Sequence, residues 1–258
     1  MQIESRDMRQ SYSMTENFRS VRDRHGATLY DGDRIPSALA TQLFDLDHWQ
    51  AQGRVRAAVA GRGEVQFIDA PFGSAVWRHY RRGGLVARFN RDRYWFHTEE
   101  RTRGFHELGV LDRLRAAGLP VPTPLAARYL RSGPWYRADL MTAEIAGART
   151  VAELLADRAP IDWAALGRCI AGFHARGLWH ADLNAHNLMV DAARKVWLID
   201  FDRAEFRPLA TAWPQDNLAR LLRSLTKIGA PAADRDFDDH WRQLHGAHAA
   251  SLGEARAA

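Results

Sequence analysis

Lysine is almost missing from this chain of 258 residues, in which only Lys195 and Lys227 occur among 36 lysines and arginines. Arginine therefore carries nearly all of the positive charge, and any site before residue 195 that needs a cation has to use it. The two residues are not equivalent, because a guanidinium is always charged and can hold an anion through two nitrogens. The net charge of +5 favours anionic partners such as phosphates, acidic sugars, membrane headgroups or nucleic acid.

Cysteine and long apolar runs are also scarce. Cys169 is the one cysteine, which excludes an internal disulfide. No apolar run approaches the roughly 20 residues of a membrane-spanning helix, and no charged-then-apolar leader opens the sequence. These absences predict a cytoplasmic protein. The composition, 46% hydrophobic and 26% charged, is typical of one large domain or of two lobes that share a cleft.

The segment HADLNAHNLMVDAARKVWLIDF contains four polar residues with a characteristic spacing. Asp182 follows His180 by two positions, Asn187 follows Asp182 by five, and Asp200 follows Asn187 by thirteen. Each residue alone would be uninformative. The full pattern, H-x-D-x-x-x-x-N and then D-F, is the arrangement of protein-kinase-like phosphotransferases.

Two short apolar runs separate the members of this pattern. Residues 188–190 and 196–199 read as strands joined by a turn over 191–195. Such a hairpin would return Asn187 and Asp200 to the same end. Oxygen ligands meeting there suit Mg²⁺, which is commonly held by one or two carboxylates and by substrate phosphates. Asp182, on the preceding loop, could then deprotonate a hydroxyl brought to that metal, while His180 would support the loop backbone.

We therefore predict an α+β, protein-kinase-like bilobal fold, with a small and mainly antiparallel β N-lobe that carries one helix, and a mainly helical C-lobe. The predicted divisions are an N-terminal extension or cap over 1–52, the N-lobe over 53–142 and the C-lobe over 143–258. Residues 216–228 and 162–177 have the periodicity of amphipathic helices, and a further helix is expected around 237–244 before an alanine-rich, frayed end.

Strand-like patterns over 55–82 surround a Gly-Arg-Gly turn. Gly61 and Gly63 could lay backbone N–H groups over the phosphates of a nucleotide, although an ordinary hairpin has the same pattern. Arg78 lies seventeen residues after Gly61, about where a kinase strand carries the cation that holds these phosphates. Arg88, on the next strand-like run, is the alternative.

Two other residues are assigned to the nucleotide site. Glu107, beside the apolar stripe of a helix over 104–117, is predicted to pair with the strand cation. Residues 141–146 should cross between the lobes, where the extended backbone around Glu144 could hydrogen-bond the adenine edge.

Arginines gather between Arg78 and Arg103, where eight of them face three acids. Within this stretch, residues 91–100 also hold Tyr94, Trp95 and Phe96. Two interpretations stay open: a loop that tucks aromatic rings into the core, or a surface that meets an anionic substrate or a membrane.

Several segments together resemble one known family: HADLNAHN, VWLIDFDR, AVWRHYRRGGL, the GRG turn and NLARLLRSL. The sequence is similar to the 3-deoxy-D-manno-octulosonic acid (Kdo) kinases of Gram-negative bacteria, relatives of the lipopolysaccharide heptose kinases. The likeness covers roughly residues 40–228 and is most specific over 177–203. It implies ATP-dependent phosphorylation of the 4-hydroxyl of Kdo on Kdo-lipid IVA, an anionic glycolipid, by a peripheral protein on the cytoplasmic side of the inner membrane.

The resemblance also implies roles for single residues. It makes Asp182 the catalytic aspartate, Asn187 and Asp200 the metal ligands, Arg78 the residue at the ATP-lysine position and Glu107 its partner. The sequence departs from protein kinases in that arginine, and in Asp202, which replaces the usual glycine. No long phosphorylatable loop follows, which argues against a protein kinase.

Other functions remain open from the residues alone. A lipopolysaccharide-heptose phosphotransferase would share the same motifs. An antibiotic phosphotransferase would need an acidic acceptor site, against which the arginine cluster argues. A nucleotide-binding pseudokinase scaffold is favoured by the missing lysine and opposed by the intact Asp182, Asn187 and Asp200. A nucleic-acid binder would fit the charge, but no recognition motif supports it, and no nucleic-acid partner is expected.

Overall fold

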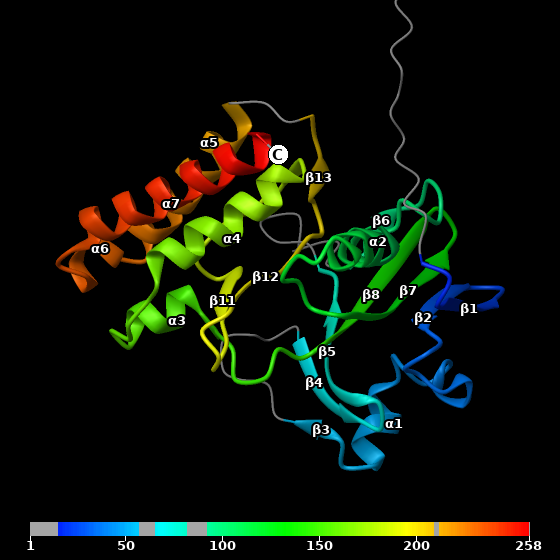
Figure 1. The fold of residues 1–258 in the computed structure, drawn as a ribbon. Helices are drawn as coiled ribbons and strands as arrows, with labels where there is room; N and C mark the ends of the chain where they lie inside the picture. Colours follow the sequence, from blue (N-terminus) through cyan, green and yellow to red (C-terminus); the bar gives the residue numbers. More distant parts are fainter. Residues whose placement is uncertain (1–14, 57–64, 82–91, 209–211, 258) are drawn as a thin grey trace, which may run out of the picture.

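An antiparallel sheet forms the core of the N-lobe in the computed structural model, which describes residues 15–56, 65–81, 92–208 and 212–257 (Figure 1). Its strands are β1 (Phe18–Asp23), β2 (Gly26–Asp31), β3 (Val55–Arg56), β4 (Val65–Ala70), β5 (Gly73–His79), β6 (Tyr94–Trp95), β7 (Pro124–Ser132) and β8 (Trp135–Ala143). The strands lie in the order β1-β2-β7-β8-β5-β4-β3, and β6 pairs with β8 beyond the end of β5.

Helix α2 (Arg103–Ala116) packs on one face of this sheet, against β7 and β8. It buries the predicted apolar stripe of Phe105, Leu108, Leu111 and Leu114. The opposite face is covered by the segment that holds the short helix η1 (Ser37–Leu39) and helix α1 (Leu46–Ala51), whose Trp49 is fully buried.

The hairpin of β1 and β2 belongs to the same sheet, because β2 pairs with β7 from Gly26 to Tyr30. Residues 18–31 therefore lie in the N-lobe sheet rather than beside it. Strand β1 (FRSVRD) has no clear apolar alternation because it is largely exposed. The domain limits at 52 and 142 stay a prediction.

The C-lobe is mainly helical, as predicted, and lies beside the N-lobe sheet (Figure 1). Its elements are β9 (Arg149–Thr150), α3 (Val151–Ala156), α4 (Trp163–Ala175), β10 (Leu178–Trp179), β11 (Leu188–Val190), β12 (Val196–Leu198), β13 (Glu205–Phe206), α5 (Ala212–Lys227), α6 (Ala230–Ala233) and α7 (Phe237–Ala257). Asp162 caps α4 by accepting a 2.8 Å hydrogen bond from the N–H of Ala165.

Helices α4 and α7 pack closely along their lengths. A Cβ on Gly167 of α4 would lie 2.2 Å from the carbonyl oxygen of Leu244, so this crossing needs glycine. The prediction of a frayed end after residue 244 was wrong, because α7 continues to Ala257. The chain beyond Leu244 stays helical because His248 and Leu252 are buried and anchor it.

The antiparallel sheet and the helical lobe agree with the predicted α+β class. Among the helices that the structure describes, each is too short or too polar to cross a bilayer.

Candidate active site

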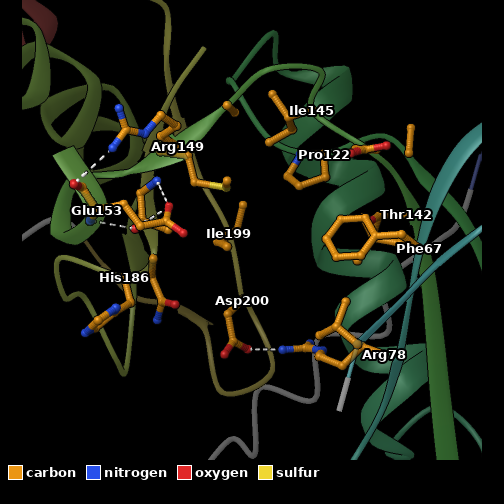
Figure 2. A pocket seen from close by; sticks show the side chains of 18 of the residues that line it. Phe67, Arg78, Pro122, Thr142, Ile145, Arg149, Glu153, His186, Ile199 and Asp200 are labelled. Carbon is orange, nitrogen blue, oxygen red and sulfur yellow. Dashed lines mark hydrogen bonds and ion pairs between the residues drawn. The ribbon is translucent and has the colours of Figure 1, made fainter. Parts of the chain in front are cut away.

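A cleft of about 1120 Å³ opens between the two lobes. Apolar side chains line it from both sides, including Phe67 and Val76 from the sheet and Met189 and Ile199 from the C-lobe. Figure 2 shows Phe67 on the wall formed by the sheet, opposite the wall formed by the C-lobe. A flat apolar group could be held between these walls.

Arg78 on β5 joins three parts of the protein at one end of this cleft. Its Nη1 donates to Asp200 Oδ1 at 2.5 Å (Figure 2), and its Nη2 forms an ion pair with Glu107 on α2. The predicted pairing of the strand cation with Glu107 is therefore present. Burial opposes the charge of Arg78, but Glu107, Tyr80 and Asp200 outweigh burial and raise its pKa well above the usual value.

Glu107 is buried and also holds the C-lobe loop. Its Oε1 accepts a 2.9 Å hydrogen bond from the N–H of Phe201, and its Oε2 accepts one of 2.6 Å from the Tyr80 hydroxyl. Sequence reasoning missed Tyr80, whose only signal is its position two residues after Arg78, just beyond the end of β5. The helix carboxylate therefore fixes both the cation and the start of the loop after Asp200.

Asp200 has a backbone φ of 66°, a left-handed conformation that non-glycine residues seldom adopt. Such a conformation persists where surrounding contacts impose it. Burial raises the pKa of its carboxyl, but the charge and hydrogen bond of Arg78 outweigh burial, so the pKa lies below its usual value. The side chain is therefore ionised at neutral pH.

The hairpin predicted beyond Asn187 is present, with Leu188 paired to Leu198. Asn187 lines the cleft with Asp200, and the N–H of Ile199 donates to the Asn187 carbonyl at 3.0 Å. The side-chain Nδ2 of Asn187 donates to the carbonyl of Asp182 at 2.9 Å. Its amide oxygen is then the atom available to a ligand in the cleft.

Asp182 lies beside the cleft rather than among its lining residues, and its side chain is exposed. His180 supports this loop as predicted: its Nδ1 accepts from the N–H of Asp182 at 3.2 Å, and its Nε2 lies 3.1 Å from the carbonyl oxygen of Ile199. Burial lowers the pKa of His180, so the ring is neutral and serves as a structural link.

The residues available to a metal are one carboxylate and one amide. Groups of three or more His, Cys, Asp or Glu suited to a metal are absent from the residues that the structure describes. Asp200 and Asn187 nevertheless offer an ionised carboxylate and an amide oxygen within one cleft. That donor set fits Mg²⁺, whose remaining ligands are usually phosphates and water.

Glu144 lines the cleft where the chain crosses between the lobes. Its N–H donates to the Ser74 carbonyl at 2.9 Å, and its carboxylate pairs with Arg56. An adenine at this crossing would therefore meet the backbone of the following residues, beginning with Ile145, which also lines the cleft. The predicted phosphate-binding turn at Gly61 and Gly63, and the alternative cation Arg88, lie outside the described residues.

Neither the position of Arg149 nor the ion pair made by Asp202 was predicted from the sequence. Arg149, beside Glu153, lines the wall opposite the sheet (Figure 2). Asp202 forms two hydrogen bonds with Arg103 at the start of α2, one of them 2.6 Å from Nε to Oδ1. The residue noted as a departure from protein kinases is therefore an ion-pair partner that connects the two lobes.

Comparison with known proteins gives the family. A model of the lipopolysaccharide kinase (Kdo/WaaP) family matches residues 46–244. The 3-deoxy-D-manno-octulosonic acid kinase of Stenotrophomonas maltophilia (strain R551-3) is 46% identical over 226 residues, which cover 86% of this chain and 89% of that protein. The kinase of the same name from Xanthomonas campestris pv. campestris (strain B100) is 43% identical over 250 residues, which cover 94% and 98%.

Among solved structures, the bifunctional kinase-methyltransferase WbdD matches 76% of this chain and 44% of its own, with a TM-score of 0.42 and 20% identity. The family match and the two curated relatives confirm the predicted resemblance and, with it, the protein-kinase-like bilobal fold. The chain belongs to the lipopolysaccharide kinase (Kdo/WaaP) family.

Proposed function

We propose that this Kdo kinase of lipopolysaccharide biosynthesis transfers the γ-phosphoryl group of ATP to the 4-hydroxyl of a Kdo residue on Kdo-lipid IVA. The observation that carries the proposal is that the cation Arg78, the carboxylate of Asp200 and the amide of Asn187 line one cleft, with Arg78 and Asp200 joined in an ion pair. Phosphoryl transfer depends chiefly on the positioning of the reactants and on neutralisation of their charge. Arg78, Asp200 and Asn187 can contribute to both.

The nucleotide base would lie between the apolar walls of the cleft. Phe67 and Val76 on one side and Met189 and Ile199 on the other offer surfaces for an adenine ring. The phosphates would then extend toward Arg78, which can bind oxygen through a guanidinium held in place by Glu107.

Asn187 and Asp200 would hold Mg²⁺ between the nucleotide phosphates and the C-lobe. When bound, the ion supplies neutralisation of charge on the β- and γ-phosphoryl oxygens. The ion pair of Arg78 with Asp200 keeps that carboxylate ionised and oriented before the ion arrives. The metal-binding carboxylate would therefore already be ionised and oriented before Mg²⁺ binds.

Asp182 would orient and deprotonate the acceptor hydroxyl. Its exposure suits this role, because the acceptor is a large glycolipid that reaches the protein from outside. The backbone carbonyl of Asp182 accepts a hydrogen bond from the Asn187 side chain, which fixes the position of the proposed base relative to the proposed metal ligand. A positioned base contributes about 10²–10⁴ in rate. We place the protein at the cytoplasmic side of the inner membrane as a peripheral protein, where this acceptor is available.

The direct test incubates purified protein with Mg·ATP and Kdo-lipid IVA. Mass spectrometry should show one added phosphoryl group on the Kdo residue, and NMR of the product should assign it to the 4-hydroxyl. Asp182→Asn should lower kcat by about 10²–10⁴-fold with nucleotide affinity unchanged. Asp216→Asn, an exposed carboxylate on α5, is the matched control and should keep wild-type turnover. Near-normal turnover by the Asp182 variant would remove this residue from the chemistry.

A further inference from the structure

A partly exposed aromatic pair lies at one end of the N-lobe sheet. Trp95 on β6 is 54% exposed and lies directly opposite Trp135 on β8, with the two rings edge to face at 5.3 Å. Leu130 on β7 is 36% exposed at the same end of the sheet. We call Trp95, Trp135 and Leu130 the outer patch. In Figure 1 this end of the sheet lies on the side of the molecule away from α5–α7.

The other face of these strands is closed by its own aromatic rings. Tyr94 pairs with Tyr136, and their rings lie 5.6 Å apart. Phe96 packs against both Tyr136 and Tyr129, the latter of which contacts α2 through Phe105. The sheet end is therefore anchored to α2 from this face, and neither Trp95 nor Trp135 belongs to the buried core.

The outer patch occupies the opposite face as a single surface. Side chains alternate between faces along a strand, and directly paired residues share a face. Trp135 and Arg137 are two apart on β8, and Arg137 pairs with Leu130, so Trp95, Trp135, Leu130 and Arg137 point to the same side. Further along β8, Met141 on this face is fully buried beneath the segment that holds α1. The segment that holds α1 therefore covers this face of the sheet around Met141 but not at the outer patch.

Arginines flank the patch. Arg137 is 48% exposed and pairs with Asp92 at 2.7 Å, and Arg93 is exposed two residues before Trp95. Tryptophan favours the boundary between lipid tails and headgroups, and arginine binds lipid phosphates. We propose that the outer patch docks the kinase on an anionic bilayer surface. This inference rests on the proposed function, because a glycolipid acceptor has to be met at the membrane.

The size of the patch favours a bilayer over a protein partner. Its three part-exposed apolar side chains amount to on the order of 300 Å², since a large aromatic residue can bury about 150–250 Å² in full. A stable protein interface buries about 800 Å² on each partner. A bilayer needs no matching surface, and a few interfacial tryptophans and arginines suffice for reversible binding.

The patch is mechanically connected to the active site. Arg103 donates to the Tyr94 hydroxyl at 2.6 Å and pairs with Asp202, two residues after Asp200. The strand that carries Trp95 is thereby fixed to the loop that carries the proposed metal ligand. Docking through this strand would hold the cleft at a set distance from the membrane surface.

Vesicle binding by the full chain tests the proposal. Sedimentation with phosphatidylcholine vesicles containing about one third phosphatidylglycerol should show binding at least about fivefold stronger than with phosphatidylcholine alone, as expected for one or more arginines at the surface. Trp95→Ser should weaken binding to the anionic vesicles about fivefold to tenfold. Ile228→Ser, which removes another exposed apolar side chain in the C-lobe, should leave it unchanged.

Equal loss in both variants, or equal binding to neutral and anionic vesicles, would overturn the proposal. The proposal would also be overturned if the wild-type protein did not bind vesicles but self-associated with rising concentration, and if Trp95→Ser abolished that self-association. Thermal melts check that the variants are folded.

Activity separates this inference from the proposed function. With Kdo-lipid IVA in anionic vesicles, Trp95→Ser should raise KM about fivefold or more and keep kcat, whereas with detergent-dispersed acceptor the variant should match the wild type. Turnover with an unchanged KM in vesicles refutes the docking surface and leaves the kinase assignment standing. Absence of turnover in wild-type protein, with vesicle binding that depends on Trp95, refutes the assignment and leaves the surface.

Discussion

Arg103, the first residue of α2, binds both carboxylate oxygens of Asp202, a residue 99 positions further along the chain. The pair joins the N-lobe to the loop that follows Asp200, and both side chains are mostly buried, at 25% and 12% exposure. Glu107, one turn along the same helix, accepts from the N–H of Phe201. One face of α2 therefore holds the segment 200–202 at two successive points.

This pair should control the position of Asp200. Asp202→Asn keeps the shape of the side chain but removes its charge, so the loop would lose its bidentate contact while the left-handed backbone at Asp200 remains costly. We expect kcat to fall about tenfold and the free energy of unfolding to fall by roughly 1–3 kcal/mol. Steady-state kinetics across a Mg²⁺ series should show the Mg²⁺ requirement rising as well.

A double-mutant cycle tests whether the two residues act together. If they do, Arg103→Met with Asp202→Asn should cost less than the sum of the single variants, with a coupling energy of about 1–3 kcal/mol. Additive losses would mean that Arg103 acts through Tyr94 alone.

Arginine at position 78 should be required rather than merely tolerated. A lysine ammonium is a single point charge and cannot reach Glu107 and Asp200 with separate nitrogens as Arg78 does. We expect Arg78→Lys to raise the KM for ATP about tenfold, and Arg78→Met to lower kcat/KM by about 10²–10³-fold. Arg56→Lys is the matched control, because Arg56 also lines the cleft but is 43% exposed. Wild-type kinetics of Arg78→Lys would show that charge alone suffices.

The parts of the site that could be predicted were those encoded by spacing along the chain. Asn187 and Asp200 flank two apolar runs joined by a short turn, so a hairpin there returns both residues to the same end, and this hairpin is present. Arg78 and Glu107 could be paired because a strand cation and a helix carboxylate follow each other in the chain at distances usual for the fold, and the ion pair is present.

What could not be predicted depends on tertiary neighbours. From the sequence, Asp202 is only a departure from the glycine of protein kinases. Its partner Arg103 belongs to a cluster of arginines that the sequence does not distinguish from one another, and the pairing is evident only when α2 is placed beside residue 202. For residues 91–100, the interpretation that aromatic rings pack inward holds for Tyr94 and Phe96, whereas Trp95 stays exposed, and a surface that meets an anionic substrate or a membrane stays a prediction. The alternation along one short strand decides between the two faces, and a two-residue strand gives almost no periodic signal.

Because α4 and α7 are in close contact at Gly167, a larger residue at this position should destabilise the protein. A methyl group there would lie 2.2 Å from the Leu244 carbonyl oxygen and 3.0 Å from the His248 nitrogen, both backbone atoms that cannot rotate away. We expect Gly167→Ala to lower the free energy of unfolding by about 2–3 kcal/mol. Gly172→Ala, on the same helix, would meet only a Leu119 methyl at 3.4 Å and should be neutral or stabilising by up to about 1 kcal/mol. Urea denaturation of both variants measures the difference, and equal effects would contradict this account of the helix crossing.

Buried histidines should make the protein less stable in mild acid. Burial, and after it the neighbouring His248, lowers the pKa of His174 to about 3. The unfolded chain takes up the proton near the ordinary value of about 6.5, so below that pH the unfolded state binds more protons than the folded state. Stability contributed by neutral His174 is therefore full above about pH 6.5 and falls by about 1.4 kcal/mol per pH unit from there toward pH 3.

At pH 5 this residue alone should cost about 2 kcal/mol relative to pH 7.5. His180 should add to the loss, because burial lowers its pKa too. Urea denaturation at the two pH values measures the change in wild type and in His174→Gln, which should be less stable at pH 7.5 but lose less on acidification. His97→Gln, an exposed histidine, is the control and should keep the wild-type slope. If His174→Gln loses as much stability as wild type between pH 7.5 and 5, the ring is not the group that takes up the proton on unfolding.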